Sequence, residues 1–317
     1  MLMEGFLTVA QQVAILFVLI GAGAAMRRAK FFDDRSVEGL INLLLLVVTP
    51  CLIVDVFQRP FDPAKLRGLG IAFAVCVFAH LAVIASALLL VRHRDENVRV
   101  PLMLSAVFSN AGFMGIPLEQ AILGDEGVFF GIVYVVVFNL VIWSWGYAMM
   151  RGGAGGAADG AQSRVRSFVN PGTIGLAVGL PFFFLSAKLP DVIGEPVHQL
   201  AGMNTPLAMV VVGYCLAGAK LGRIARLRAV YVAAFVRLVG YPLAVIAAFY
   251  PFRHQLDRNL MLATVVAASA PVAAMVSMFA AKFDRDVDVA VGMVSGTTLL
   301  SILTMPAVIA LAMFLFG

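Results

Sequence analysis

Residues 109–117 read SNAGFMGIP, inside an apolar segment of roughly 98–123 that is long enough to cross a bilayer. This stretch is a poor helix interior, because Gly costs about 1 kcal/mol relative to Ala and Pro removes a backbone donor. In lipid, a broken backbone survives only where protein or a water-filled cavity satisfies its polar groups. The stretch therefore predicts a helix–break–helix at membrane depth, of the kind that binds substrates in secondary transporters. A kinked helix with close packing through small residues is the alternative.

The composition excludes a soluble domain of this length, since 62% of the residues are hydrophobic and 13% are charged. We predict an all-α membrane protein with several crossings. The net charge of +5 is assigned to cytoplasmic loops, so no nucleic-acid partner is expected. The three cysteines lie far apart in apolar segments, and we expect no disulfide, metal site or cofactor.

Ten apolar segments have the length that a crossing needs. They are approximately 5–26, 36–57, 67–91, 98–123, 127–150, 171–187, 196–219, 228–250, 258–281 and 287–315. If the N-terminus is outside, the loops on the cytoplasmic side hold 16 Lys and Arg residues and the outer loops hold 6. The positive-inside rule then places both termini outside, with no cleaved signal peptide. We expect the protein to lie in a bacterial inner membrane, with both termini in the periplasm.

A Gly/Ala-rich stretch at 151–170 predicts a flexible cytoplasmic linker between two halves of five segments, 1–150 and 171–317. Because five is odd, a repeated second half must enter the membrane with inverted orientation.

Two pairs of motifs support this repeat at nearly constant offsets. Thr49-Pro50 and Thr205-Pro206 lie 156 residues apart, and Pro117 and Pro271 lie 154 apart. Chance matches between Pro-tolerant membrane helices are the alternative explanation. The fold prediction is a five-plus-five inverted repeat with two broken, crossing helices.

Half-helices that begin at membrane depth present free N–H groups, which attract anions. Pro117 and Pro271 each suit the first turn of such a half-helix. Polar side chains nearby could bind a substrate or could pack helices together. The candidate substrate-binding residues are Asn110, Gly112, Pro117, Asn139, Asn204, Ser269 and Pro271. Structural or gating roles are predicted for Thr49, Pro50, Thr205 and Pro206, while Asn42 is assigned to helix packing.

Two ionisable residues lie deep in predicted crossings, where charge is costly and often functional. His80 could carry a proton or make an interhelical hydrogen bond. Arg237 could bind an anion or extend to the cytoplasmic surface. Glu119 is predicted to be solvated at an outer helix end.

Several motifs resemble those of the auxin efflux carrier family, and the resemblance covers essentially the whole chain. They are residues 109–117 followed by 138–143 (FNLVIW), 170–172 (NPG), 206–209 (PLAM), 237–238 (RL), 242–243 (PL) and 279–283 (FAAKF). The similarity is greater to the short bacterial malate or malonate permease-like branch than to the plant carriers.

The resemblance implies a scaffold of segments 1, 2, 6 and 7 and a moving transport domain of segments 3–5 and 8–10. It implies that segments 4 and 9 cross at Pro117 and Pro271, that Asn110 is the site asparagine, and that the scaffold forms a homodimer. Plant members carry an acidic residue in segment 3, where this chain has only His80, so the resemblance does not extend to auxin as a substrate.

No GxSxG, HExxH or P-loop motif is present, so neither an enzyme nor an ATP-driven pump is expected. The predicted function is secondary transport of a small organic anion, a mono- or dicarboxylate, by alternating access, with protons favoured as the coupling ion. There are two alternatives. One is a sodium-coupled symporter like the bile-acid carriers, and the other is a membrane sensor that binds the anion without moving it.

Overall fold

The computed structural model describes residues 2–152, 171–218 and 227–317. Within these ranges the chain is α-helical and strands are absent, apart from one isolated bridge, which confirms the predicted all-α class. The predicted linker lies outside the described residues from residue 153 onward.

Each of the ten predicted segments falls on helical structure in the described ranges. The first half contains α1 (Leu2–Arg28), α2 (Asp34–Leu43), α3 (Thr49–Phe57), α4 (Pro63–Leu90), α5 (Glu96–Val107), α6 (Ile116–Val141) and α7 (Tyr147–Arg151), with π-helical turns η1 (Leu44–Val48), η2 (Ala111–Gly115) and η3 (Ile142–Gly146). The second half contains α9 (Pro171–Leu185), α10 (Asp191–Gly202), α11 (Asn204–Ala217), α12 (Arg228–Phe235), α13 (Tyr241–Phe249), α14 (Arg258–Ser269), α15 (Met275–Lys282) and α16 (Val287–Phe316), with the π-helical turn η6 (Val236–Gly240) and the 3₁₀ turn η7 (Tyr250–Phe252).

Six helical runs in the described residues are long and apolar enough to cross a membrane. They are Arg35–Phe57, Pro63–Leu90, Ala111–Arg151, Asp191–Ala217, Arg228–Phe252 and Val287–Phe316, and a shorter apolar helix covers Thr173–Leu185. The broken segments cannot qualify as single helices, because α5 and α14 have only 12 residues each.

Aspartates begin many of these helices. Asp33, Asp62, Asp95, Asp257 and Asp286 each accept a hydrogen bond from a backbone N–H in the first turn that follows. Such caps satisfy N–H groups that have no partner within the helix, and a negative charge suits the positive end of the helix dipole.

Three of the π-helical turns directly precede a proline in the first turn of the next helical stretch. The prolines are Pro50, Pro117 and Pro242. A proline lacks the N–H donor, and its ring clashes with the carbonyl four residues back. A widened turn relieves this clash, so these helices continue past proline with a local bulge instead of ending.

Gly124 turns α6 back on itself, at φ 64° and ψ −155°. A side chain at Gly131 would lie against the Glu119 carboxyl group. Along a straight helix these two residues would be about 18 Å apart. The long run Ala111–Arg151 is therefore a tight helical hairpin, and its turn lies between predicted segments 98–123 and 127–150.

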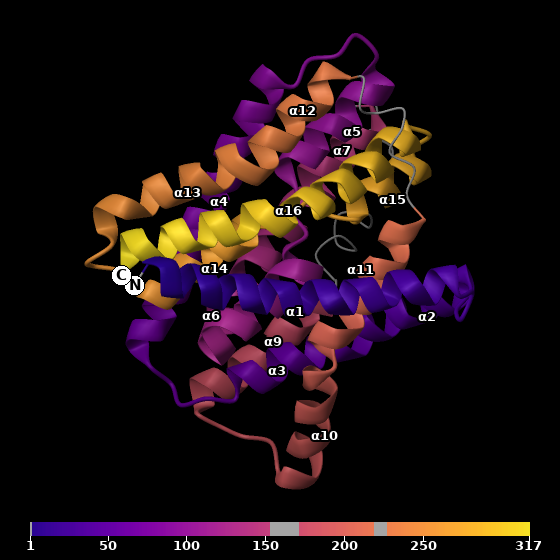
Figure 1. Ribbon diagram of the computed structural model, residues 1–317. Helices are drawn as coiled ribbons and strands as arrows, with labels where there is room; N and C mark the ends of the chain where they lie inside the picture. Colours follow the sequence, from indigo (N-terminus) through magenta and orange to yellow (C-terminus); the bar gives the residue numbers. More distant parts are fainter. Residues whose placement is uncertain (1, 153–170, 219–226) are drawn as a thin grey trace.

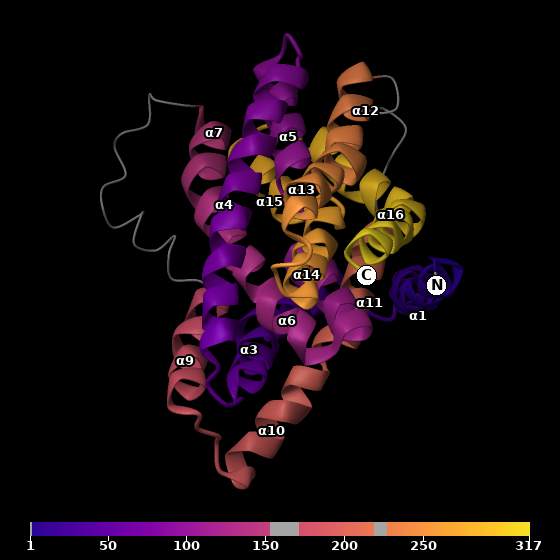
Figure 2. The ribbon, with the colours of Figure 1, turned by 90° about the vertical axis from the view of Figure 1, so that its left-hand side faces the viewer.

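Close packing of α1 against α11 depends on glycine. A Cβ atom at Gly23 would lie 2.0 Å from the Val210 carbonyl oxygen, and one at Gly213 would lie 1.9 Å from that of Ile20. α1 also runs alongside α16 in the opposite direction (Figure 1). In Figure 2, α1 lies at the right-hand edge of the bundle, and α4 lies to the left of α13.

Candidate functional site

The two chain breaks predicted from the sequence lie against each other. Residues 108–110 separate α5 from η2, and residues 270–274 separate α14 from α15. The Asn110 N–H donates to the Pro271 carbonyl oxygen at 2.6 Å, and the Ala273 N–H donates to that of Phe108 at 3.0 Å. Ser109 and Val272 form the antiparallel bridge between these bonds. The breaks thus satisfy each other's backbone groups, as a buried broken helix requires.

The position of the crossing corrects part of the prediction. The breaks meet at Asn110 and Pro271, whereas Pro117 lies seven residues further on, in the first turn of α6. Pro271 lies within the break, because α15 begins only at Met275. The prediction that Pro271 starts the second half-helix is therefore wrong. Because proline has no backbone N–H, Pro271 leaves no donor unsatisfied in the break. Its carbonyl oxygen accepts the hydrogen bond from the Asn110 N–H.

Arg237 binds the ends of both half-helices that precede the breaks. Its guanidinium group donates to the Val107 carbonyl oxygen at 2.7 Å and also to that of Ala268. These carbonyls lie in the last turns of α5 and α14, where the helix dipole is negative. Arg237 is fully buried and stacks over the Tyr241 ring at 4.6 Å. It therefore neither reaches the cytoplasmic surface nor lines the cavity described below.

A small polar cluster lies beside Arg237. The Ser109 hydroxyl donates to the Tyr134 hydroxyl at 3.1 Å, which donates to that of Tyr241 at 3.3 Å. His80 packs against the Tyr134 ring, and its Nδ1 bonds the Cys76 carbonyl oxygen at 2.8 Å. Its other ring nitrogen, Nε2, is buried without a hydrogen-bond partner. This arrangement gives His80 a hydrogen bond within its own helix.

A cavity of about 330 Å³ opens on the other side of the crossing. It is bounded by the start of η2, by the start of α15, and by parts of η1, α6, η3 and α11. Its lining residues are Asn42, Leu44, Leu45, Leu46, Thr49, Ser109, Asn110, Gly112, Phe113, Ile116, Val135, Phe138, Asn139, Trp143, Asn204, Ala273, Ala274 and Met275. Within the described ranges this wall holds amide, hydroxyl and aromatic groups but no charged side chain.

Some polar groups of this cavity already have a hydrogen-bond partner within the protein, and others do not. Asn139 donates to the Val135 carbonyl oxygen one turn earlier, at 2.8 Å. The Thr49 hydroxyl reaches the Asn204 side-chain oxygen at 3.5 Å, and the Asn204 amide nitrogen is buried without a partner. Asn110 is 6% exposed, and only its backbone groups form hydrogen bonds to the described residues. The whole side-chain amide of Asn110 and the side-chain N–H groups of Asn204 are therefore free for a ligand.

The structure brings together five of the residues singled out from the sequence, namely Thr49, Asn110, Gly112, Asn139 and Asn204. The others lie away from this wall. The Ser269 hydroxyl donates to the Val266 carbonyl oxygen at 2.8 Å within its own helix. The remaining predicted residues outside the lining are Pro50, His80, Pro117, Thr205, Pro206, Arg237 and Pro271.

Sequence reasoning missed three kinds of residue. Asn42 was assigned to helix packing but lines the cavity, as do Phe138 and Trp143. Phe138 and Trp143 are the first and last residues of the motif FNLVIW, so the motif could have identified both. Glu119, expected to be solvated, is fully buried.

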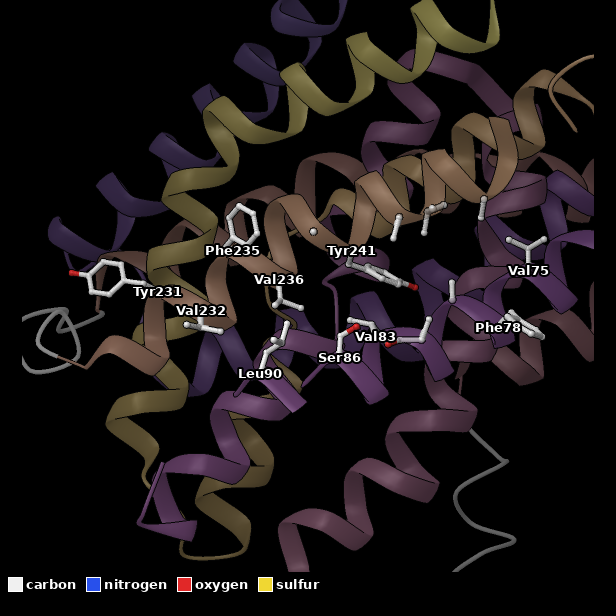
Figure 3. Close-up of a pocket in the computed structure, with 16 residues that line it drawn as sticks. Val75, Phe78, Val83, Ser86, Leu90, Tyr231, Val232, Phe235, Val236 and Tyr241 are labelled. Carbon is white, nitrogen blue, oxygen red and sulfur yellow. Dashed lines mark hydrogen bonds between the residues drawn. The ribbon is translucent and has the colours of Figure 1, made fainter. Parts of the chain in front are cut away.

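A larger cavity of about 650 Å³ lies between α4 and the run α12–η6–α13 (Figure 3). Its wall is almost wholly apolar, with Val75, Phe78 and Val83 on one side and Phe235 and Val236 on the other. Ser86, Tyr231 and Tyr241 supply its polar atoms. The cavity at the crossing has the more polar lining, with four asparagine side chains, and is therefore the candidate binding site.

Comparison with known proteins agrees with this architecture. A family model described as membrane transport protein matches residues 8–309. The chain is also similar to an uncharacterized transporter of Methanothermobacter thermautotrophicus, with 25% identity over 303 residues that cover 95% of this chain and 97% of that protein. This similarity confirms the prediction of a multi-pass membrane transporter rather than an enzyme. The chain belongs to the membrane transport protein family, which includes the auxin efflux carriers.

Proposed function

We propose that this transporter moves a small organic anion, a mono- or dicarboxylate, across the membrane by alternating access. We assign it ten crossings as a five-plus-five inverted repeat, in a bacterial inner membrane with both termini periplasmic. The observation that carries the proposal is the cavity at the crossing, where two half-helices begin beside free amide groups.

The chemistry of this cavity favours an anion. The starts of η2 and α15 both border it, and helix starts carry partial positive charge and unpaired N–H groups. The opposite helix ends, which would attract a cation, are already bound by Arg237. The amides of Asn110 and Asn204 can donate to carboxylate oxygens. A volume of about 330 Å³ suits a small molecule rather than a lipid or a peptide.

The packing supports an inward-open conformation. Under the proposed topology, the cavity lies on the cytoplasmic side of the crossing. An apolar layer closes the outer side. One face of this layer comes from α1, η1 and α11, and the other comes from η2, α6, α14 and α16. Its buried members are Leu16, Ile20, Leu44, Val48, Met114, Leu118, Ala208, Met209, Val266, Ala270, Met305 and Ile309.

An ion pair supports the same closure near the outer end. Arg59, in the connection between α3 and α4, pairs with Glu126 at 3.1 Å, beside the hairpin turn of α6. We assign α1–α3 and α9–α11 to a scaffold and the other helices to a moving domain. Opening to the outside would then move the two sides of the apolar layer apart and break this ion pair.

For the coupling ion we favour protons over sodium, since the lining of the described cavity includes no carboxylate oxygen for sodium. A sodium symporter that uses backbone carbonyls is the second candidate. We also propose that the scaffold forms the homodimer contact.

Counterflow in proteoliposomes tests the proposal. Vesicles loaded with unlabelled malonate, malate, acetate or an amine are diluted into the labelled compound. We expect labelled carboxylate to enter transiently, in sodium-free buffer, and amines not to enter. Entry of amines alone, or a strict sodium requirement, would overturn the substrate or the coupling assignment. Binding of a carboxylate without any counterflow would indicate a sensor.

A further inference from the structure

Glu119 is a fully buried acid that the cavity does not use. It lies in the first part of the α6 hairpin, one turn after Ile116, which borders the cavity. Neither of its carboxyl oxygens has a hydrogen-bond partner in the described structure. Most buried acids bind a basic group or several donors, because an unpaired buried charge is costly.

The surroundings of Glu119 are small and uncharged. Its carboxyl group occupies the space that a side chain at Gly131 would need, since a Cβ there would lie 1.7 Å from Glu119 Oε2. Gly115 lies on another side, between this carboxyl group and Ala267 of α14. The geometry suits a neutral carboxylic acid, which needs no counter-ion.

In the part of the chain that the structure describes, the Cys76 thiol of α4 is a titratable group close to Glu119 and also close to the Thr264 hydroxyl of α14. Further along the hairpin, Glu126 pairs with both Arg59 and Lys65, and the Asp125 carboxylate accepts a hydrogen bond from the Gln120 side-chain amide. No basic side chain in the described residues therefore holds Glu119 in its ionised form.

The position of Glu119 connects its environment to the proposed conformational change. Its neighbour Leu118 and Met114, one turn earlier, both belong to the apolar layer that closes the outer side. When that layer separates, water would reach the first part of the hairpin. Burial of Glu119 would then alternate with hydration during each cycle.

We propose that Glu119 is the proton-binding residue of this carrier. This inference rests on the proposed alternating-access function and names the group that couples it to protons. In the outward-open conformation the hydrated carboxylate takes one proton and becomes a neutral acid. Closure of the apolar layer carries that proton inward with the substrate, which offsets one negative charge of the anion. In the inward-open conformation the proton leaves Glu119 toward the cavity, which Ile116 borders one turn earlier on α6, and its release to the inside restores the carboxylate.

A first test measures protonation without any substrate. The purified full-length protein is titrated between about pH 5 and about pH 9 while infrared difference spectra record the C=O stretch of protonated carboxyl groups. We expect a buried-carboxyl band that Glu119→Gln removes and that Glu38→Gln, at an exposed position of α2, retains. A wild-type spectrum without a titrating carboxyl band, or a band that persists in Glu119→Gln, would overturn the assignment.

A second test measures coupling, with malonate as the probe. Wild-type proteoliposomes should accumulate malonate when the inside is alkaline, and Glu119→Gln should lose this accumulation while retaining malonate counterflow. Glu119→Asp should regain part of the accumulation, because it keeps a carboxyl group. Proton-driven accumulation by a folded Glu119→Gln protein would refute the role. If the wild type moves no carboxylate, the proposed function fails, and the spectra still decide whether Glu119 titrates.

Discussion

The Arg237 guanidinium group donates to the Val107 carbonyl oxygen at 2.7 Å and so binds the last turn of the half-helix α5. The same group binds the Ala268 carbonyl in the last turn of α14. A single planar group therefore holds together two half-helices that are far apart in the sequence. This contact fixes the geometry of the crossing from the side opposite the cavity.

Replacement of Arg237 by Lys should destabilise the protein. One ammonium group cannot reproduce two separate guanidinium contacts. The expected loss is about 1.5–3 kcal/mol for a hydrogen bond to a charged group. Thermal unfolding in detergent measures it. Arg253→Lys serves as the control, because Arg253 is partly exposed and, among the described residues, its side chain contacts Tyr250, three positions earlier. Equal unfolding midpoints for Arg237→Lys and wild type would show that the contact does not hold the crossing.

Replacement of Asn110 by Ala should weaken substrate binding without unfolding the protein. The lost hydrogen bond to a charged ligand corresponds to about 1.5–3 kcal/mol, or roughly ten- to a hundredfold in affinity. The apparent affinity in carboxylate counterflow measures this change. Asn259→Ala, outside the cavity lining, is the matched control. Wild-type affinity and rate in Asn110→Ala would make Asn110 a packing residue.

Replacement of Gly213 by Ala should separate α1 from α11, because the new Cβ atom would lie 1.9 Å from the Ile20 carbonyl oxygen. Backbone cannot move as easily as a side chain, and overpacking of this kind costs about 1–3 kcal/mol. Gly21→Ala is the control, since no atom lies within 4 Å of its added Cβ. Unfolding midpoints in detergent distinguish the two variants. If both behave alike, the close approach of the helices is not required for stability.

Accessibility of engineered cysteines should reveal the topology. In a variant without Cys51, Cys76 and Cys215, an impermeant maleimide added to intact cells should label a Cys placed after Gly317. It should not label Ala157→Cys, which lies in the predicted linker, outside the described residues. Labelling in the reverse pattern would invert the orientation, and labelling of both positions would require an even number of crossings between them.

The sequence by itself determined the membrane class and the positions of both breaks. Gly and Pro disfavour an unbroken helix, so the clusters at 109–117 and 269–271 indicated the neighbourhood of the breaks, which lie at residues 108–110 and 270–274. Asn110, Asn139 and Asn204 were recognisable because a polar side chain is costly at membrane depth wherever it points.

Only the tertiary structure decided the surroundings of Arg237, Glu119 and Asn42. The helix α4, like α6 and α16, is apolar all round, so its sequence does not reveal which face meets another helix and which meets lipid. The reversal at Gly124 brings Gly131 against Glu119, and the packing of η6 beside both breaks gives Arg237 its two carbonyl partners. These contacts join segments distant in the sequence, and the physical cause of each is the close packing of helices rather than the local preference of any residue.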